Sequence, residues 1–166
     1  MEGYFLLTLR LMLYFIHMPV FIATDHRGFE LKNKLVEYLQ EKDIRIEDFG
    51  NYEFDPLDDH PDFAQKVAQA VQQSPQENLG IVICGSGIGV SMAVNRFKHV
   101  RCGIALSIEQ VQHGRENDHT NILAIASDYT DFETAKKYVD IFLSAHPKSD
   151  EKYLRRENKL DIIPSQ

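Results

Sequence analysis

Five short runs of apolar residues recur along the chain, and amphipathic segments separate them. Runs of this length, rich in β-branched residues, are typical of buried strands. They predict strands over residues 19–24, 44–49, 79–84, 101–106 and 121–126. The intervening segments repeat apolar residues every three or four positions, which is typical of helices that cover a sheet. They predict helices over 29–41, 61–71, 91–97, 107–114 and 131–144, and the charged segment 150–163 predicts a last helix.

Strands that alternate with helices favour a parallel sheet covered on both faces. We therefore predict an α/β fold with a five-stranded parallel sheet. In such folds ligands bind beyond the carboxyl ends of the strands. This rule predicts one site from residues 25–26, residues 84–89, and the segment that precedes Asn121 or the one that follows Leu106.

Composition limits the classes of function. A chain of 166 residues with 43% hydrophobic content is long enough for one well-packed domain. The net charge of −7 argues against a nucleic acid as the main partner. The two cysteines, Cys84 and Cys102, have no metal-ligand spacing and form no Cys-x-x-Cys pair. A reducing, cytoplasmic location is therefore predicted rather than a disulfide framework.

The first 17 residues form a distinct apolar stretch. Residues 1–17 are strongly apolar but are interrupted by Arg10. The stretch is short for a membrane span and lacks the basic start and small-residue cleavage site of a signal peptide. We interpret it as an extension of doubtful origin with Met18 as the biological start, the alternatives being a membrane anchor or an ordered extra element. No membrane partner is expected.

The third predicted strand ends in an unusual stretch. It stops at Cys84, and Gly85-Ser86-Gly87-Ile88-Gly89 follows before the next predicted helix. Outward-pointing amides in such a loop can bind an anion, and a thiol beside that anion can move a proton. The spacing Gly-x-Gly-x-Gly is not a dinucleotide-binding fingerprint, and no P-loop lysine follows. The alternatives are a tight turn that needs glycine and a cysteine buried as a small apolar residue.

Polar groups that could meet this loop are few. Asp25 and His26 end the first predicted strand, where they are either a surface turn or a pair that binds a polyol and a phosphate. His113 and His119 flank a polar run, and either could approach a site. The basic residues of the last helix are either a solvated face or groups that close over a phosphate. They are Lys152, Arg155 and Arg156.

Four segments together resemble one family in order and spacing. They are Asp25-His26-x-Gly28-x-x-Leu31-Lys32, Asp48-Phe49-Gly50, Pro61-Asp62-Phe63-Ala64 and Ile83-Cys84-Gly85-Ser86-Gly87-Ile88-Gly89. They resemble the type B ribose-5-phosphate isomerases, which are grouped with the galactose-6-phosphate isomerase subunits. The resemblance implies a Rossmann-like three-layer sandwich, with residues 18–166 forming one sugar-phosphate isomerase domain that ends in a helical arm. It also implies a homodimer or homotetramer with sites at the subunit interface, and no metal or cofactor.

The resemblance further implies the reaction and its residues. An aldose phosphate and a ketose phosphate are interconverted through an enediolate. Cys84 would be the base that moves the proton, and Ser86 would assist it. The amides of Gly85, Gly87, Ile88 and Gly89 would hold the enediolate charge. Asp25 and His26 match the pair that contacts the sugar and the phosphate.

Several positions depart from the family pattern. Asn117 stands where the family has the histidine that helps open the sugar ring, and Asp118 stands where it has asparagine. Asp128 stands where it has a phosphate-binding arginine, a reversal of charge. The two arginines of the family's tail fall on Lys152 and Arg156. Our hypothesis is that proton transfer is retained, that the phosphate side is remodelled, and that His119 takes over ring opening.

Three functions are compared on this basis. The leading one is isomerisation of ribose 5-phosphate to ribulose 5-phosphate. The second is isomerisation of a hexose phosphate or another modified sugar. The third is a sugar-phosphate-binding relative without turnover, against which the presence of Cys84 argues.

Overall fold

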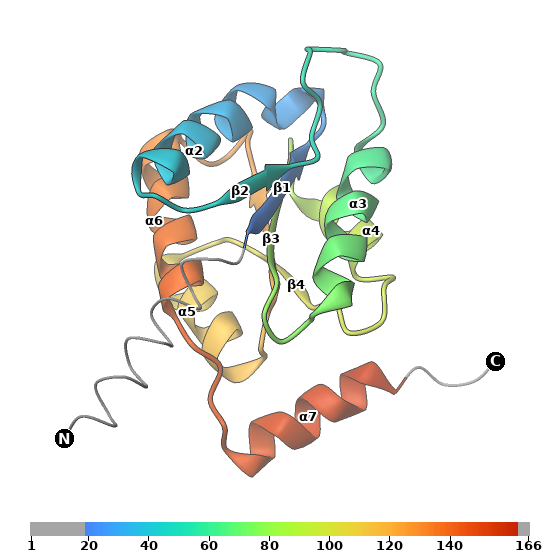
Figure 1. The fold of residues 1–166 in the computed structure, drawn as a ribbon, viewed down its shortest axis with the longest axis vertical. Coiled ribbons are helices and arrows are strands. Elements are labelled where there is room, and N and C mark those ends of the chain that lie inside the picture. The colour runs from blue at the N-terminus through green and yellow to red at the C-terminus, as the bar shows by residue number, and fades with distance from the viewer. Residues whose placement is uncertain (1–18, 163–166) are drawn as a thin grey trace.

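A twisted parallel sheet forms the centre of the molecule, and helices cover both of its faces (Figure 1). The computed structural model describes residues 19–162. The strands lie in the order β2-β1-β3-β5-β4, and every neighbouring pair is parallel. Their bounds are β1 Val20–Thr24, β2 Ile46–Asp48, β3 Leu79–Cys84, β4 Cys102–Ile104 and β5 Ile122–Ala126. The predicted Rossmann-like α/β sandwich with five parallel strands is confirmed.

Six of the described helices fall in segments predicted to be helical, most with shifted ends, and a short 3-10 helix follows β1 where the sequence suggested a surface turn. The helices are η1 His26–Gly28, α2 Phe29–Glu41, α3 His60–Gln73, α4 Ile88–Val94, α5 Ile108–Asn117, α6 Phe132–Ser144 and α7 Glu151–Asp161. Helix α4 begins three residues before the predicted start, because Gly87 adopts a positive φ of 71° and turns the chain directly from the glycine loop into the helix. The expectations for residues 1–17 lie outside the described residues.

Two apolar clusters hold the layers together. Helices α2, α5 and α6 cover one face of the sheet, where Leu35, Val111 and Phe142 pack against β-strand residues. Helices α3 and α4 cover the other face through Val67 and Val94 among others. Because β1, β3 and β5 are buried on both sides, their sequences are continuous apolar runs rather than alternating ones. In the described part of the chain, no helix is long and apolar enough to cross a membrane.

Close packing of α3 on β3 depends on a missing side chain. A Cβ at Gly80 would lie 2.5 Å from Val67 Cγ1 and 3.2 Å from Val71 Cγ2. We expect Gly80→Ala to lower the free energy of unfolding by about 1–3 kcal/mol, because α3 must move off the sheet. Gly103→Ala in β4 is the matched control, since its Cβ would meet nothing nearer than 3.7 Å. Urea unfolding of both variants measures the difference, and equal midpoints would contradict this account.

Candidate active site

The carboxyl ends of β1, β3 and β5 meet at one edge of the sheet, where hydrogen bonds tie them together. The Thr24 hydroxyl donates to the Ile83 carbonyl at 3.1 Å. Ser127, just after β5, donates its hydroxyl to the carbonyls of Arg27, at 3.1 Å, and Cys84, at 3.2 Å. The Asp128 amide donates to the Gly85 carbonyl at 3.0 Å. This edge therefore holds the residues that follow the three strands in one rigid arrangement.

Cys84 lies at the base of this arrangement, with only 5% of its surface exposed. Its sulfur accepts a hydrogen bond from the Gly87 amide at 3.2 Å, so the loop curls back over the thiol. The Ser86 hydroxyl is exposed and accepts from the Ile88 amide at 3.2 Å. The thiol is thus buried beneath the glycine loop, with one loop amide bonded to its sulfur.

A histidine covers the far end of this loop. A Cβ at Gly89 would lie 2.6 Å from His60 Nε2, so the imidazole ring rests directly on that glycine. His60 is the first residue of α3, and its position in an acidic loop gave no indication of this contact. Only a residue without a side chain fits between the ring and the loop.

Asp25 and His26 occupy the neighbouring strand end, and the structure brings them to the same edge as Cys84. The Asp25 carboxylate is buried and accepts from the Arg27 amide at 3.0 Å. Burial raises the pKa of Asp25, although that hydrogen bond opposes the effect. The ionised form of Asp25 has therefore lost much of its hydration in the folded protein.

His26 is oriented by a partner that the sequence analysis did not identify. Asp58 Oδ1 accepts from the His26 amide at 3.0 Å and lies 2.6 Å from His26 Nδ1. Nδ1 then carries the proton toward Asp58, and Nε2 is left for a ligand. The hydrogen bond to Asp58 raises the pKa of His26. Burial opposes ionisation of Asp58, but the bonds from His26 and Asn51 outweigh it and lower the Asp58 pKa.

This pair predicts a pH dependence. A histidine with a raised pKa contributes stability below its unfolded pKa, near 6.5, and loses that contribution as the pH rises through the folded value. Asp58→Asn removes the anion, so the titration midpoint of His26 should fall in an NMR titration. Asp55→Asn is the control, because Asp55 lies in the same loop but accepts from the Leu57 amide. An unchanged His26 midpoint in Asp58→Asn would refute the pairing.

Arg27 and Asp128 form an ion pair across the top of the loop. Arg27 Nη2 donates to Asp128 Oδ2. A Cβ at Gly85 would lie 2.8 Å from Asp128 Oδ2 and 3.1 Å from Arg27 Nε, so both side chains rest on that glycine. The charge reversal that the sequence shows at Asp128 is therefore compensated by a guanidinium from η1.

The other candidate residues lie at the amino ends of the parallel strands, opposite the carboxyl ends where Cys84 lies. Residues 117–121 precede β5, and a segment that precedes a parallel strand lies at its amino end. This corrects the expectation that the segment before Asn121 shares an edge with Cys84. Asn117 contacts His113 and the Lys148 ammonium, each at 3.0 Å, and Asp118 is exposed.

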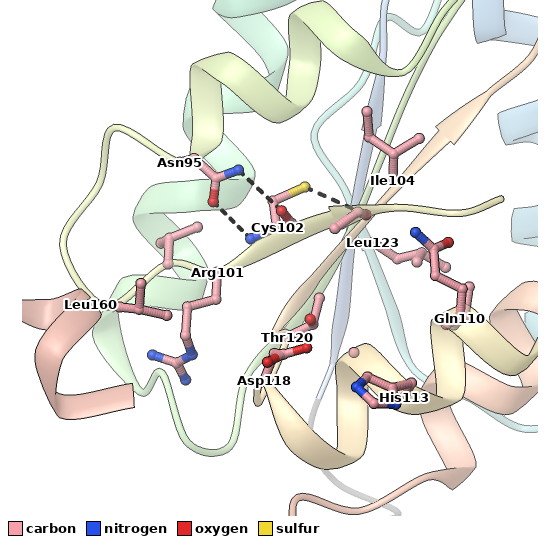
Figure 2. A pocket seen from close by; sticks show the side chains of 14 residues that line it. Asn95, Arg101, Cys102, Ile104, Gln110, His113, Asp118, Thr120, Leu123 and Leu160 are labelled. Carbon is pink, nitrogen blue, oxygen red and sulfur yellow. Dashed lines mark hydrogen bonds between the residues drawn. The ribbon is translucent and has the colours of Figure 1, made fainter. Parts of the chain in front are cut away.

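A cavity of about 460 Å³ lies beside β4, the last strand in the order of the sheet (Figure 2). Asp118 and His113 line it, and Cys84 does not. Asn95 brackets Cys102 there, accepting from its amide at 2.8 Å and donating to its carbonyl at 3.1 Å. Within one chain, the Cys84 loop and the Asn117–Asp118 segment therefore belong to different surfaces.

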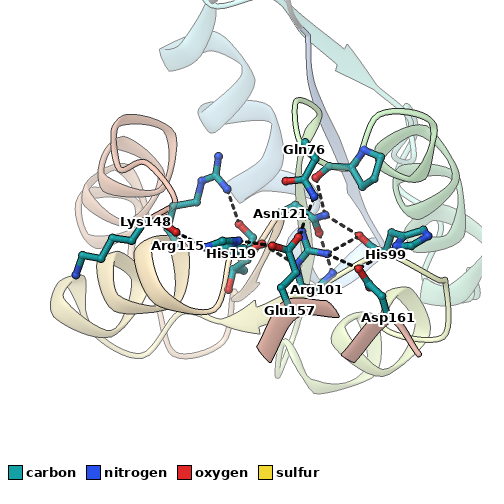
Figure 3. Close-up of polar contacts among 11 residues, drawn as sticks. Gln76, His99, Arg101, Arg115, His119, Asn121, Lys148, Glu157 and Asp161 are labelled. Atoms are coloured by element: carbon teal, nitrogen blue, oxygen red, sulfur yellow. Dashed lines mark hydrogen bonds and ion pairs between the residues drawn. The ribbon is translucent and has the colours of Figure 1, made fainter. Parts of the chain in front are cut away.

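His119 joins the last helix to the domain, as Figure 3 shows. It is 3% exposed, its Nδ1 lies 2.5 Å from Glu157 Oε2 of α7, and its Nε2 lies 3.0 Å from the Lys148 carbonyl. Arg101 Nη2 contacts Glu157 Oε1 at 2.9 Å. Both ring nitrogens of His119 are engaged in fixing α7, so within one chain the ring has no nitrogen to offer to a sugar near Cys84.

The three basic candidates of α7, Lys152, Arg155 and Arg156, are exposed. Lys152 and Arg156 lie over the ring of Tyr153, with 4.6 Å from the Lys152 ammonium and 6.0 Å from the Arg156 guanidinium carbon to the ring centroid. Since Glu157 holds α7 against residues that precede β4 and β5, this helix lies at the amino edge of the sheet, away from Cys84. Among residues 19–162, no group of three His, Cys, Asp or Glu side chains is placed to hold a metal ion.

Comparison with known proteins gives consistent matches. A family model described as Ribose/Galactose Isomerase matches residues 20–160. The probable ribose-5-phosphate isomerase B of Mycoplasma pneumoniae is 39% identical over 127 residues, which is 76% of this chain and 83% of the relative. The ribose-5-phosphate isomerase B of Escherichia coli is 36% identical, over 73% and 80%. The structure of the Mycoplasma genitalium ribose-5-phosphate isomerase B with bound ribulose-5-phosphate has a TM-score of 0.83 and 37% identity, covering 87% of this chain and 96% of that one.

Proposed function

The chain belongs to the ribose/galactose isomerase family and is an aldose–ketose isomerase, and we propose that it interconverts ribose 5-phosphate and ribulose 5-phosphate with Cys84 as the base. The observation that carries the proposal is the buried Cys84 thiol, bonded to the Gly87 amide at the end of β3, next to the strand that leads into Asp25 and His26. The names of the relatives and the ribulose-5-phosphate bound to the M. genitalium protein support this substrate pair.

The proposed reaction moves one carbon-bound proton. The Cys84 thiolate removes the proton from C2 of the open-chain aldose, and the electron pair of that C–H bond forms the C1–C2 double bond. The negative charge moves to O1, where the loop amides other than those of Gly87 and Ile88, which bond to Cys84 and Ser86, stabilise it as an oxyanion hole does. The proton on O2 passes to O1, and the thiol returns its proton to C1 to give the ketose. Atoms and charge balance without any cofactor.

The neighbouring groups have supporting roles in this proposal. The exposed Ser86 hydroxyl assists at the loop, and the buried Asp25 carboxylate accepts from a sugar hydroxyl. His26, with Nδ1 held by Asp58, offers Nε2 to the substrate, and its raised pKa favours the cationic form that attracts a phosphate. Asp25 and His26 follow β1 and Ser86 follows β3, so the sugar is contacted from two neighbouring strand ends.

We further propose that the protein is a homodimer or homotetramer and that a second copy completes the site. Asn117, Asp118, Lys152 and Arg156 lie away from Cys84 in one chain, so they can serve it only from another copy. Exposed apolar side chains around α4 and the end of β4 favour an interface there. They are Ile88, Met92, Leu106 and Ile108. The contacts of His119 favour a role in docking α7 over the ring-opening role that the sequence suggested.

An assay across sugar phosphates tests the substrate. We expect turnover with ribose 5-phosphate to exceed that with hexose 6-phosphates, and we expect solvent deuterium to enter the carbon-bound position as proton transfer proceeds in D₂O. Greater turnover with a hexose phosphate would show that the substrate is a hexose phosphate and not ribose 5-phosphate. Binding without turnover of any sugar phosphate would instead indicate a non-catalytic relative.

Mixed oligomers test the shared site. Cys84→Ala and Asp118→Ala are each expected to be weakly active, because each damages one half of every site. Unfolding and refolding the two together should restore activity, because some mixed sites then hold Cys84 from one copy and Asp118 from the other. Mixing Cys84→Ala with Ser86→Ala, both on the same half, is the control and should restore nothing. Restoration in both mixtures, or in neither, would contradict the shared site.

A further inference from the structure

Arg27 is the basic side chain that the fold places in contact with the glycine loop. It lies in the short helix η1, directly after the buried strand β1, and 55% of its side chain is exposed. Its Nε would be 3.1 Å from a Cβ at Gly85, so the guanidinium covers the glycine that follows Cys84. Because Gly85 is next to Cys84 in the chain, a substrate bound at the thiol can reach the exposed Arg27 guanidinium.

Asp128 fixes this guanidinium without saturating it. The ion pair engages Nη2, whereas a guanidinium has five N–H donors arranged in a planar fork. The remaining donors match the oxygen spacing of a phosphate, to which arginine binds in a bidentate manner. Asp128 is itself held, because its amide donates to the Gly85 carbonyl at 3.0 Å. The pair therefore holds the guanidinium in one position, with donors that remain for a second anion.

A cavity beside Arg27 offers several N–H and O–H donors, and residues 84–89 are not among those that line it. Its volume is about 570 Å³. It is lined by three basic side chains, one hydroxyl and one carboxylate, which are His26, Arg27, Lys34, Ser127 and Glu30. The remaining lining is apolar and comes from Phe29, Leu31, Phe54 and Phe132. The bond to Asp58 favours the protonated form of His26. Asp58 and Asp128 pair with His26 and Arg27, so these two basic groups offer an anion their remaining N–H donors rather than a net positive charge.

We propose that Arg27 binds the phosphate of the substrate, with Asp128 holding its guanidinium over Gly85. This inference rests on the proposed function. It explains how a site with a carboxylate at position 128 accepts an anionic sugar, since Arg27 neutralises Asp128 and presents its free donors beside the loop. Arg27 also determines which end of the sugar lies at Cys84, because the phosphate is held on the side of η1.

Steady-state kinetics of Arg27→Gln test the assignment. Since a hydrogen bond to a charged group contributes about 1.5–3 kcal/mol, the KM for ribose 5-phosphate should rise by about tenfold to a hundredfold. The inhibition constant of inorganic phosphate should rise by a similar factor, while kcat changes less. Arg45→Gln is the matched control, because Arg45 is exposed and lies just before β2, at the amino end of that strand. A KM and a phosphate inhibition constant that stay within about twofold of the wild type would overturn the assignment.

Exchange of the two charges gives a second test that does not depend on one variant. Arg27→Asp should be the weakest binder, because two carboxylates then face the phosphate. Adding Asp128→Arg to it returns a cation to the surface of Gly85 and should recover part of the lost affinity. No recovery in a folded double variant would contradict a phosphate site at this pair.

Calorimetry with inorganic phosphate separates this inference from the proposed reaction. If the wild type fails to isomerise ribose 5-phosphate yet binds phosphate, and Arg27→Gln does not, the reaction is wrong and the Arg27 site stands. If the wild type is an active isomerase and Arg27→Gln binds phosphate equally well, the reaction stands and the Arg27 site is wrong. Absence of phosphate binding to the wild type also overturns the Arg27 site.

Discussion

Cys84→Ala is expected to lower kcat for ribose 5-phosphate by about 10²–10⁴-fold, the range that a positioned acid–base group contributes. The methyl group keeps the loop in place but cannot take a proton from C2. The KM should change much less, because the proposed phosphate and hydroxyl contacts come from other residues. Proton exchange between substrate and D₂O, followed by NMR, should fall by the same factor as turnover.

The second cysteine provides the control for this substitution. Cys102 lies on β4 at the other cavity, and burial raises the pKa of its thiol far above the usual range. Cys102→Ala should therefore leave kcat within about twofold of the wild type, as expected for a group outside the reaction. If Cys84→Ala retains a tenth or more of wild-type turnover, the base is another group at this edge, and His60 against Gly89 becomes the first to test.

Glu157→Ala is expected to lower the free energy of unfolding by about 3–5 kcal/mol, the usual loss when one partner of a buried ion pair is removed. Glu157 is the buried carboxylate that faces the Arg101 guanidinium at 2.9 Å and the His119 ring at 2.5 Å. Arg115 is buried nearby, and burial followed by repulsion from Arg101 lowers its pKa to about 10. Without Glu157, Arg101 and His119 lose the anion that compensates them, and α7 loses its anchor.

Urea unfolding, together with limited proteolysis of α7, measures this loss. Glu151→Ala is the matched control, because Glu151 is an exposed carboxylate in the first turn of the same helix. It should change the free energy of unfolding by no more than about 0.5–1 kcal/mol. Equal midpoints for Glu157→Ala and the wild type would show that α7 is held by other contacts.

The same carboxylate predicts an acid limb in stability. Burial opposes ionisation of Glu157, but the bonds from Gln76 and the charges of Arg101 and His119 outweigh it and lower its pKa below 4.5. A group with a lowered pKa in the folded state contributes stability above its unfolded pKa and loses it as the pH falls through the folded value. Glu157→Gln should lack that limb in unfolding curves measured between pH 5 and about 3.

The sheet and its covering helices were predictable because burial leaves a periodic record in the sequence. The run 79–84 is apolar throughout since β3 is buried on both faces, and α6 shows its apolar stripe every three or four residues. The start of α4 was misjudged because it depends on the backbone conformation of Gly87, which has no periodic signal.

Only part of the candidate site was predictable for a similar reason. The topological rule correctly brought Asp25, His26 and Cys84 to one edge. Asp58 and Asp128 were not identified as partners, because the contacts of His26 and Arg27 join residues 32 and 101 positions apart. Their charges looked like ordinary surface acids. His119 was placed near Cys84 because it lies close to a site-like motif in sequence, although a residue before a parallel strand lies at the opposite edge.

The hydrogen bonds of Ser127 have a consequence for substrate length. Its hydroxyl donates to both Arg27 and Cys84, so the backbone positions of the proposed phosphate-binding group and of the thiol are tied to one residue. The backbones from which the proposed phosphate-binding group and the thiol extend are thus kept at a fixed separation. We expect such a site to discriminate by the number of carbons between the two ends of a sugar, so that a chain longer by one carbon aligns less well with the sulfur.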